Sequence, residues 1–431
     1  MYNQPVSDAS LVACPHCDLL QHVPELAPGA SARCPRCDEE LRRHRPDPFG
    51  RTLAFAIAAA ILYVVANTVP MLGLRAVGHQ ASTTVFGGVL QLWKDGFGLV
   101  ALLVLLSAIV APALQIGLML AVVAGGSRRT PPRWVGPLLR HQPTATTWSM
   151  IEVMLLGVLV ALIKIADYAT VVPGIALFVL GALIFLLAAI QASFDPEVVW
   201  SRIAWAAGAA ASEREASLRI PPGATAMEVG LQRCDVCELL SRPPGGADDG
   251  RCPRCDEALT FRKPGAVQQT WAFLVAAAIC YVPANVLPVL VTSTVQGTES
   301  DTILQGVVLL WSPTGWPLSL IVLIASIMIP SAKLAALAYL LVTVQRGSLR
   351  NNRQRGRLYR IVEIIGRWSM VDVFVDTFTA ALVQLPPLMS VAPGPGLPFF
   401  AAVVVLTMLA AASFDSRLIW DPVAATEVCH A

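Results

Sequence analysis

Charged side chains are scarce in this chain. Asp, Glu, Lys and Arg make up 14% of its 431 residues, whereas about 25% is usual in soluble proteins. Lysine is the rarer basic residue, with four copies against 27 arginines, and histidine occurs only six times. Hydrophobic residues instead make up 55% of the chain. This balance excludes an ordinary soluble protein, and it also excludes a disordered chain, which would be poor in apolar residues and rich in charge.

Several enzyme motifs are missing as well. The sequence contains no Walker A glycine loop, no HExxH, no GxSxG and no GxGxxG after a predicted strand, so ATP hydrolysis, metalloprotease and esterase chemistry are not predicted. We therefore expect a protein that is not an enzyme. The net charge of +2 gives no indication of nucleic acid as a partner.

Long apolar runs indicate membrane helices. A helix that spans a bilayer needs about 20 mostly apolar residues. Eight stretches fit: 53–73, 97–124, 147–165, 173–192, 270–292, 316–344, 368–385 and 397–414. The first begins near Leu53, after a long polar segment, so it is not predicted to be a cleaved signal peptide.

The basic residues are distributed unevenly between the loops. With a cytoplasmic amino terminus, 27 of the 31 fall on the cytoplasmic side, and seven arginines lie in 345–367 alone. Arg75 and Lys94 lie on the opposite side, and Lys164 and Lys333 fall inside spans. Because cytoplasmic loops collect Lys and Arg, we predict eight helices with both termini in the cytoplasm.

The chain consists of two similar halves. A cysteine segment, CxxC followed by CPRCDE, begins each half, and later motifs recur at an offset of 218 to 220 residues. The matching pairs are Tyr63 and Tyr281, Asn67 and Asn285, Pro70 and Pro288, Trp93 and Trp311, and Pro112 and Pro330. WSM recurs at 148–150 and 368–370, and SFD at 193–195 and 413–415. Four spans per half give a parallel repeat, because an even number of spans leaves both halves in the same orientation.

The predicted fold is therefore an all-α polytopic membrane protein with a pseudo-twofold axis. Its predicted domains are a zinc ribbon at 1–50, a four-helix repeat at 51–200, a linker and second ribbon at 201–265, and a second repeat with a carboxyl-terminal tail at 266–431.

Eight cysteines form two sets with the spacing of metal-binding knuckles. The sets are Cys14, Cys17, Cys34 and Cys37, and Cys234, Cys237, Cys252 and Cys255. Paired CxxC knuckles predict a zinc ribbon with one structural Zn²⁺ in each set, because four thiolates fill a tetrahedral shell and leave no open position for catalysis. Two disulfide-stapled loops are the alternative, which the predicted reducing compartment disfavours. A redox-sensing role for the ribbons stays open.

Polar residues inside the predicted spans are candidates for function, because a polar group in lipid is costly. Lys333 lies in the middle of a span, far from both ends, and Lys164 lies near an outer end, where an interfacial role is the alternative. Glu152, Asp372 and Asp376 lie near the inner ends of the third spans. They either pair with arginines such as Arg140 and Arg367 or form a proton relay.

Two further motifs belong to the first spans and the segments that follow them. Asn67 and Asn285 each precede a proline by three residues, which predicts a kinked helix that either lines a cavity or only serves packing. Apolar residues recur at helical spacing in 85–93 and 303–311, each ending in Trp. This pattern favours an interfacial helix, with a loop leading into the next span as the alternative.

Taken together, the duplicated ribbon, YxxxNxxP, WSM[IV][ED]V and SFD motifs resemble the paraquat-inducible protein A family over nearly the whole chain. The resemblance implies a Gram-negative inner-membrane protein that works with a periplasmic MCE-domain protein and moves phospholipid between the inner membrane and that partner's tunnel. It also implies a polar transmembrane core at Lys164 and Lys333. The alternative function is a membrane-bound zinc-ribbon scaffold or stress sensor without transport activity.

Overall fold

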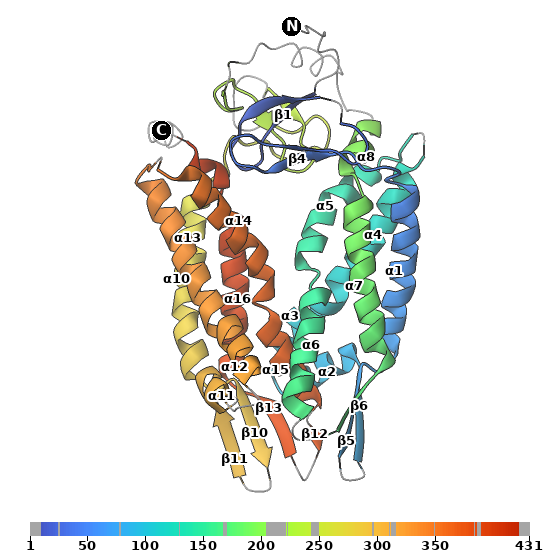
Figure 1. The fold of residues 1–431 in the computed structure, drawn as a ribbon, viewed down its shortest axis with the longest axis vertical. Coiled ribbons are helices and arrows are strands. Elements are labelled where there is room, and N and C mark those ends of the chain that lie inside the picture. Colours follow the sequence, from blue (N-terminus) through green and yellow to red (C-terminus); the bar gives the residue numbers. More distant parts are fainter. Residues whose placement is uncertain are drawn as a thin grey trace.

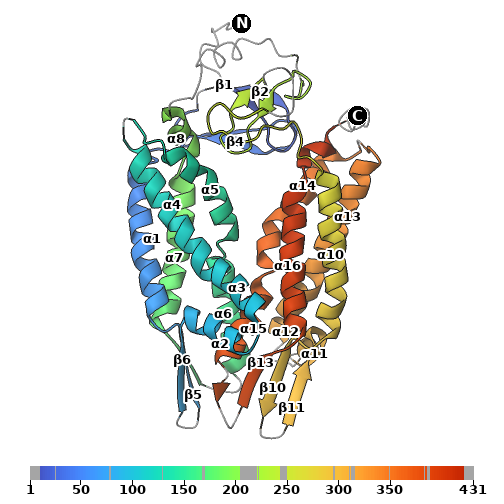
Figure 2. The same cartoon turned by 180° about the vertical axis from the view of Figure 1, so that it is seen from behind.

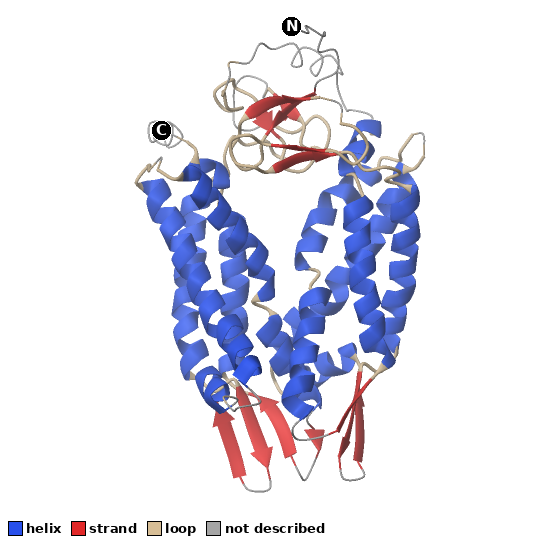
Figure 3. Ribbon diagram, viewed as in Figure 1, coloured by secondary structure: helices blue, strands red, loops and turns tan. Residues whose placement is uncertain are grey.

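The computed structural model describes residues 10–24, 26–76, 79–128, 130–166, 170–203, 221, 223–242, 250–294, 297–309, 311, 316–348, 350–382, 384–385 and 389–421. Long helices form its middle, both cysteine segments lie at one end, and short strands lie at the other (Figures 1 and 3). We name these the ribbon end and the strand end. Among the described residues, seven helices are long and apolar enough to cross a membrane. Most of the predicted linker 201–230 lies outside the described residues.

The two halves contain the same elements in nearly the same order. In the first half, ribbon 1 contains β1 (Ser10–Ala13), β2 (Leu20–Val23), β3 (Ser31–Arg33) and β4 (Glu40–Arg43). The first membrane repeat contains α1 (Gly50–Thr68), β5 (Leu72–Ala76), β6 (His79–Thr83), α2 (Val85–Lys94), α3 (Gly98–Val104), η1 (Leu105–Val110), α4 (Ala111–Gly126), α5 (Val135–Trp148), α6 (Ile151–Ala166), β7 (Thr170–Pro173), α7 (Ile175–Ser193) and α8 (Pro196–Arg202).

In the second half, ribbon 2 contains β8 (Gln232–Arg233) and β9 (Leu240–Ser241). The second membrane repeat contains α10 (Ala266–Val286), β10 (Leu290–Thr294), β11 (Gly297–Asp301), α11 (Ile303–Leu309), α12 (Trp316–Leu323), η3 (Ile324–Met328), α13 (Ile329–Gln345), α14 (Asn352–Trp368), α15 (Val371–Leu382), β12 (Gln384–Leu385), β13 (Met389–Pro393), α16 (Gly396–Ser413) and η4 (Ser416–Ile419). The structure therefore confirms the tandem repeat.

The third span of each repeat is a helix in two parts. The breaks lie between α5 and α6 and between α14 and α15, at the two WSM motifs. In the first repeat, the Met150 N–H bonds to the Ser107 carbonyl at 3.2 Å, as a broken helix in lipid requires. The predicted span 368–385 corresponds to α15, whose 12 residues extend only about 18 Å. This helix continues α14 instead of crossing a bilayer alone.

Short antiparallel strands close the strand end, and the sequence did not predict them. Strand β5 pairs with β6 and β7, and β13 pairs with β10 and β12. The predicted spans 53–73 and 270–292 were too long, because α1 and α10 end at Thr68 and Val286. Pro70 and Pro288 therefore lie beyond the helix ends and do not kink them, which corrects that prediction. A residue without an N–H often follows a helix terminus.

The segment 85–94 is a helix, as its spacing predicted. Helix α2 buries Val85, Val89 and Leu92 and exposes Phe86, Leu90 and Trp93. Its buried side packs against α3 and against α15 of the other repeat. A position in the membrane interface stays a prediction.

The two repeats meet near the strand end. Helix α6 packs along α15, and the largest buried apolar cluster contains residues of both repeats. At the crossing, a Cβ added to Gly157 would lie 2.8 Å from Phe374 Cβ and 3.1 Å from the Val371 carbonyl oxygen. Only glycine allows so close an approach. From this crossing the repeats diverge toward the ribbon end (Figures 1 and 2).

Candidate metal centres and inter-repeat cavity

The eight cysteines lie in four turns that have the same backbone conformation. In each turn, the N–H of the first cysteine bonds to the carbonyl five residues later at 2.7 to 3.0 Å. The residue after the second cysteine returns its N–H to the first cysteine's carbonyl, and its φ lies between 59° and 66°. Those four residues are Asp18, Asp38, Glu238 and Asp256. Asp is enriched in this left-handed region, which explains the CPRCD motif.

The turns bring the sulfur atoms of each set together. Within each set all four Sγ atoms lie within 4.8 Å of one another. The shortest Sγ separations are 3.4 Å, between Cys14 and Cys37 in the first set, and between Cys234 and Cys255 and between Cys237 and Cys252 in the second. Thiolates at about 2.3 Å from a tetrahedral ion are about 3.8 Å apart, close to this arrangement, whereas a disulfide needs about 2.05 Å. Each set therefore fits a metal ion, and the described cysteines form no disulfide.

Ribbon 1 makes most of its side-chain contacts with the second membrane repeat. The contacts are Arg360 of α14 with Glu39 (2.9 Å) and with the Cys37 carbonyl (2.6 Å), His16 with Ser416 (3.1 Å), and the Arg36 guanidinium over the Trp420 ring (4.6 Å). Arg262, just before α10, adds ion pairs to Asp18 and Asp421 at 2.9 and 2.7 Å. Burial alone would lower the pKa of Arg262, but these carboxylates hold it above its usual range.

Ribbon 2 packs against the first membrane repeat. Cys234, Cys237 and Cys252 belong to the same buried apolar cluster as Val199 and Trp200 of α8. Arg140 of α5, one of the arginines expected to pair with a carboxylate of the third spans, instead forms an ion pair with Glu257 of ribbon 2. The ribbons thus cross over and connect the repeats where these diverge. Ribbon 1 also reaches α8 through an ion pair of Arg42 with Glu197.

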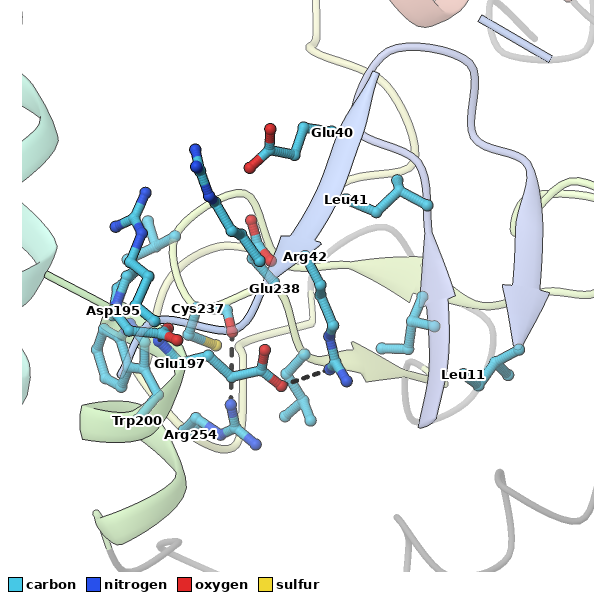
Figure 4. Close-up of a pocket in the computed structure, with 16 residues that line it drawn as sticks. Leu11, Glu40, Leu41, Arg42, Asp195, Glu197, Trp200, Cys237, Glu238 and Arg254 are labelled. Atoms are coloured by element: carbon cyan, nitrogen blue, oxygen red, sulfur yellow. Dashed lines mark hydrogen bonds and ion pairs between the residues drawn. The ribbon is translucent and has the colours of Figure 1, made fainter. Parts of the chain in front are cut away.

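A pocket of about 480 Å³ lies where β4, ribbon 2 and α8 meet. Figure 4 shows Arg42 directed at Glu197 and Arg254 directed at the carbonyl of Cys237. Four arginines and four carboxylates line the pocket: Arg42, Arg43, Arg45 and Arg254, and Glu40, Asp195, Glu197 and Glu238. Because the two signs balance, this pocket has no surplus charge to attract an ion.

A second cavity, of about 650 Å³, opens between the two repeats beneath the ribbons. Helices α5 and α7 line one side, α14 and α16 line the other, and ribbon 2 covers part of it. Its apolar lining includes Met119, Leu139, Phe194, Ile364 and Met408. Its polar lining includes Arg45, Gln142, Thr146, Gln191, Asp235, Glu238 and Glu363. We name it the inter-repeat cavity.

Lys333 lies directly behind this cavity. The residue is 2% exposed, and its Nζ donates to Thr407 Oγ1 at 2.8 Å and to Ser369 Oγ at 3.3 Å. Ser369 is the serine of the second WSM break, and a Cβ on the cavity-lining Gly366 would lie 4.0 Å from Nζ. Lys333 therefore joins α13, α16 and the broken helix, and it does not extend toward a membrane surface.

The other predicted polar residues lie at separate places. Glu152 and Asp372 lie in the first turns of α6 and α15, directly after the two breaks. Asp372 is 9% exposed, and Asp376 lies one turn further along α15. Lys164 lies near the end of α6, and its side chain is outside the described part. Lys333 and Asp372 both lie at the break between α14 and α15. Lys333 contacts Ser369 within the break, and Asp372 follows Val371, the first residue of α15.

Asn67 and Asn285 stabilise helix ends instead of lining the cavity. Each donates its side-chain amide to the carbonyl four residues earlier, Tyr63 at 2.9 Å and Tyr281 at 2.8 Å. The two tyrosine hydroxyls in turn donate to carbonyls in the π-helical turns η1 and η3, Ile109 at 2.6 Å and Ile327 at 3.2 Å. A π turn disturbs the regular helical bonding, so YxxxN fastens each first helix to its repeat's irregular turn.

The sequence reasoning did not find Arg45, Glu363, Ser369 and Thr407 as site residues. The WSM repeat pointed to Ser369, but nothing in the sequence indicated that this serine marks a helix break. Arg45 and Glu363 come from segments more than 300 residues apart, and only the folded chain brings both to one cavity.

The chain resembles known proteins along nearly its whole length. It is 33% identical over 415 residues to the intermembrane transport protein PqiA of Escherichia coli strain K12, covering 96% of each chain. It is 32% identical to the lipophilic envelope-spanning tunnel protein A of that strain, covering 95% of this chain and 90% of the relative. A probable intermembrane transport protein of Haemophilus influenzae is 27% identical over 95% of each chain. No solved structure matches this chain.

The family profile of paraquat-inducible protein A matches residues 49–204 and again 267–424. These two segments are the membrane repeats described above, and the relatives extend the similarity over the ribbons. The chain is therefore a member of the paraquat-inducible protein A family.

Proposed function

We propose that this protein is the inner-membrane subunit of a lipid transport system of the Gram-negative envelope. It takes phospholipid from the inner membrane and passes it to a periplasmic MCE-domain protein that forms a tunnel, without changing the lipid covalently. The relatives named for intermembrane transport and for an envelope-spanning tunnel support this proposal.

The inter-repeat cavity is the observation that carries the proposal. Its volume of about 650 Å³ is in the range of ligand sites, and its lining combines apolar side chains with a few polar groups. A phospholipid has the same two parts. Because both repeats contribute to the lining, a change in their separation changes the cavity, as in transporters built from repeats around one site.

The proposed orientation places the ribbons and both termini in the cytoplasm. The arginine-rich segments precede α1 and follow α13, both at the ribbon end, whereas Lys94 is the last residue of α2 at the strand end. This distribution supports a cytoplasmic ribbon end by the positive-inside rule. The strand end then faces the periplasmic partner.

Zn²⁺ is the proposed metal of both cysteine sets. Four thiolates in a closed tetrahedral arrangement suit Zn²⁺, and modules this small need a metal to fold. Each set of four cysteines would hold one structural ion. This ion would stabilise the ribbon and so keep its contacts with the opposite membrane repeat in place.

Lipid retention tests the transport proposal. The full chain and the Lys333→Ala variant are purified at matched detergent exposure, and bound phospholipid is quantified by mass spectrometry. We expect the wild type to retain about one phospholipid per chain and Lys333→Ala to retain several-fold less, because Lys333 fixes the wall of the cavity at Ser369 and Thr407. Gln115→Ala is the control, since Gln115 is the equivalent buried residue of the first repeat.

Equal, nonspecific retention by all three proteins would overturn the transport proposal. A scaffold or stress sensor that recruits a cytosolic partner through the ribbons would then explain the architecture better. Envelope survival assays in cells make the same distinction. If the protein is a scaffold, survival depends on the ribbon cysteines and not on Lys333.

A further inference from the structure

The charges that face the inter-repeat cavity are not all neutralised. Of its three carboxylates, Asp235 and Glu238 belong to ribbon 2 and are held by arginines. Arg233 lies 2.7 Å from Glu238 and 3.8 Å from Asp235, and Arg417 lies 3.7 Å from Asp235. These two acids therefore contribute little free negative charge to the cavity.

Arg45 and Glu363 are the charged residues of the cavity left without an ion-pair partner in the described residues, and the nearby His16 imidazole is the titratable group that interacts with the Glu363 charge. Neither forms an ion pair within 4 Å in the described part of the chain, and neither side chain donates or accepts a hydrogen bond there. The Arg45 Nε is buried without a partner. A buried guanidinium donor without an acceptor is unfavourable unless a ligand supplies one.

The two residues come from opposite halves of the molecule. Arg45 follows β4 of ribbon 1 and lines both this cavity and the neighbouring pocket. Glu363 lies on α14, one turn beyond Arg360, which binds ribbon 1. The cavity thus presents a cation and an anion from its two sides, together with an apolar lining that includes Met119, Ile364 and Met408.

A ligand that matches this pattern carries a phosphate and an ammonium a few bonds apart and has apolar chains. Arginine binds phosphate through paired N–H donors, and a carboxylate binds a primary ammonium. An anionic headgroup without an amine would place no cation near Glu363 and would be repelled by it.

We propose that Arg45 and Glu363 form a recognition site for the zwitterionic phosphoamine headgroup of a phospholipid. This inference rests on the proposed function and adds the substrate class: Arg45 binds the phosphate, Glu363 binds the ammonium, and the acyl chains follow the apolar walls. The charge pair then selects which lipid enters the cavity from the ribbon end.

A competition experiment tests the site. The purified full chain is incubated with equal amounts of phosphatidylethanolamine and phosphatidylglycerol with identical oleoyl chains, and the bound ratio is measured by mass spectrometry. We expect a preference for the amine lipid of roughly fivefold, the size of one partly solvated charge pair. Arg45→Gln should reduce retention of both lipids. Glu363→Gln should still retain lipid but should no longer prefer phosphatidylethanolamine over phosphatidylglycerol.

Two variants serve as controls. Arg43→Gln and Glu40→Gln remove the same charges from side chains that line the neighbouring pocket and not this cavity, so both should keep the wild-type ratio. Glycerophosphoethanolamine, which has the headgroup without chains, is added as a competitor. Its failure to displace lipid at millimolar concentration supports a lipid site, and full displacement would assign the site to a soluble phosphoamine.

A wild-type ratio near one overturns the headgroup inference but leaves the transport proposal intact, because lipid is still bound. Loss of preference in Arg43→Gln or Glu40→Gln to the same extent as in Glu363→Gln also overturns it, since general surface charge would then explain the ratio. Absence of any retained lipid is a failure of the proposed function itself.

Discussion

The Arg360 guanidinium donates a hydrogen bond of 2.6 Å to the backbone carbonyl of Cys37, a metal-site residue 323 positions away in the chain. A second Nη of the same side chain lies 2.9 Å from Glu39. One arginine of the second membrane repeat therefore holds the last knuckle of ribbon 1. The crossed arrangement of the ribbons depends on contacts of this kind.

Arg360→Gln should loosen ribbon 1 without unfolding the helices. Losing one charge-assisted hydrogen bond and an ion pair costs about 1 to 3 kcal/mol, so we expect faster release of the ribbon 1 metal to a chromogenic chelator. Arg357→Gln, on the exposed side of α14, is the control. Identical release rates in both variants would contradict a role for Arg360 in holding the ribbon.

The equivalent aspartates of the SFD motifs should differ in importance. Asp415 is 3% exposed, binds Arg417 at 2.9 Å and accepts the Lys263 N–H at 3.1 Å. Asp195 caps α8 through the Glu197 N–H, and no arginine forms an ion pair with it in the part of the chain that the structure describes. Asp415→Asn should cost about 3 kcal/mol, the effect of breaking a buried pair, and Asp195→Asn should cost less than about 1 kcal/mol. Thermal unfolding of both variants in detergent measures the difference.

The Asp415–Arg417 ion pair also makes the stability of the fold depend on pH. Burial alone would raise the pKa of Asp415, but the Arg417 guanidinium and the Lys263 N–H hold it below the usual 3.8. A carboxyl with a depressed folded-state pKa stabilises the fold above about pH 3.8 and loses that contribution as the pH falls through the folded value. The stability difference between wild type and Asp415→Asn should therefore be constant near neutral pH and shrink below about pH 3.8. A difference that stays constant down to pH 2 would contradict the assignment.

The structural features that depend on local residue spacing could be predicted from the sequence. Four-residue knuckles and apolar runs depend on neighbours within one segment, so the cysteine sets, the repeat and the positions of the long helices could be inferred. The strands could not, because Leu72–Ala76 is short and its first residues, Leu72 and Gly73, continue the apolar run of the preceding helix. The crossed ribbons and the partners of Lys333 arise from contacts between distant segments, such as Arg360 with Cys37, and no pattern within one segment encodes them.

The contact between the repeats should depend on Gly157. A leucine there would enter the space of Phe374 and the Val371 carbonyl, and overpacking of this kind costs about 1 to 3 kcal/mol. Gly157→Leu should lower the thermal midpoint and widen the separation of spin labels placed on α6 and α15. Gly181→Leu on α7, where a Cβ meets no atom within 4 Å, should change neither measurement.

Metal loss from one ribbon should affect the opposite membrane repeat. Cys14→Ser with Cys34→Ser removes two thiolates of ribbon 1, which contacts α14 and the segment after α16. Cys234→Ser with Cys252→Ser does the same to ribbon 2, which contacts α5 and α8. Metal binding supplies much of the folding free energy of small metal modules, so each ribbon should lose its structure and its contacts.

Hydrogen exchange distinguishes this crossed arrangement from one in which each ribbon packs against its own membrane repeat. The ribbon 1 variant should increase amide exchange in α14 around Arg360 and leave α5 protected, and the ribbon 2 variant should do the reverse. A chelator that removes both metals should produce both changes at once in the wild type. If each variant instead exposes its own repeat, the crossed contacts do not persist in solution. Because the ribbons connect the repeats where these diverge, their loss should also widen the inter-repeat cavity and lower lipid retention in both variants.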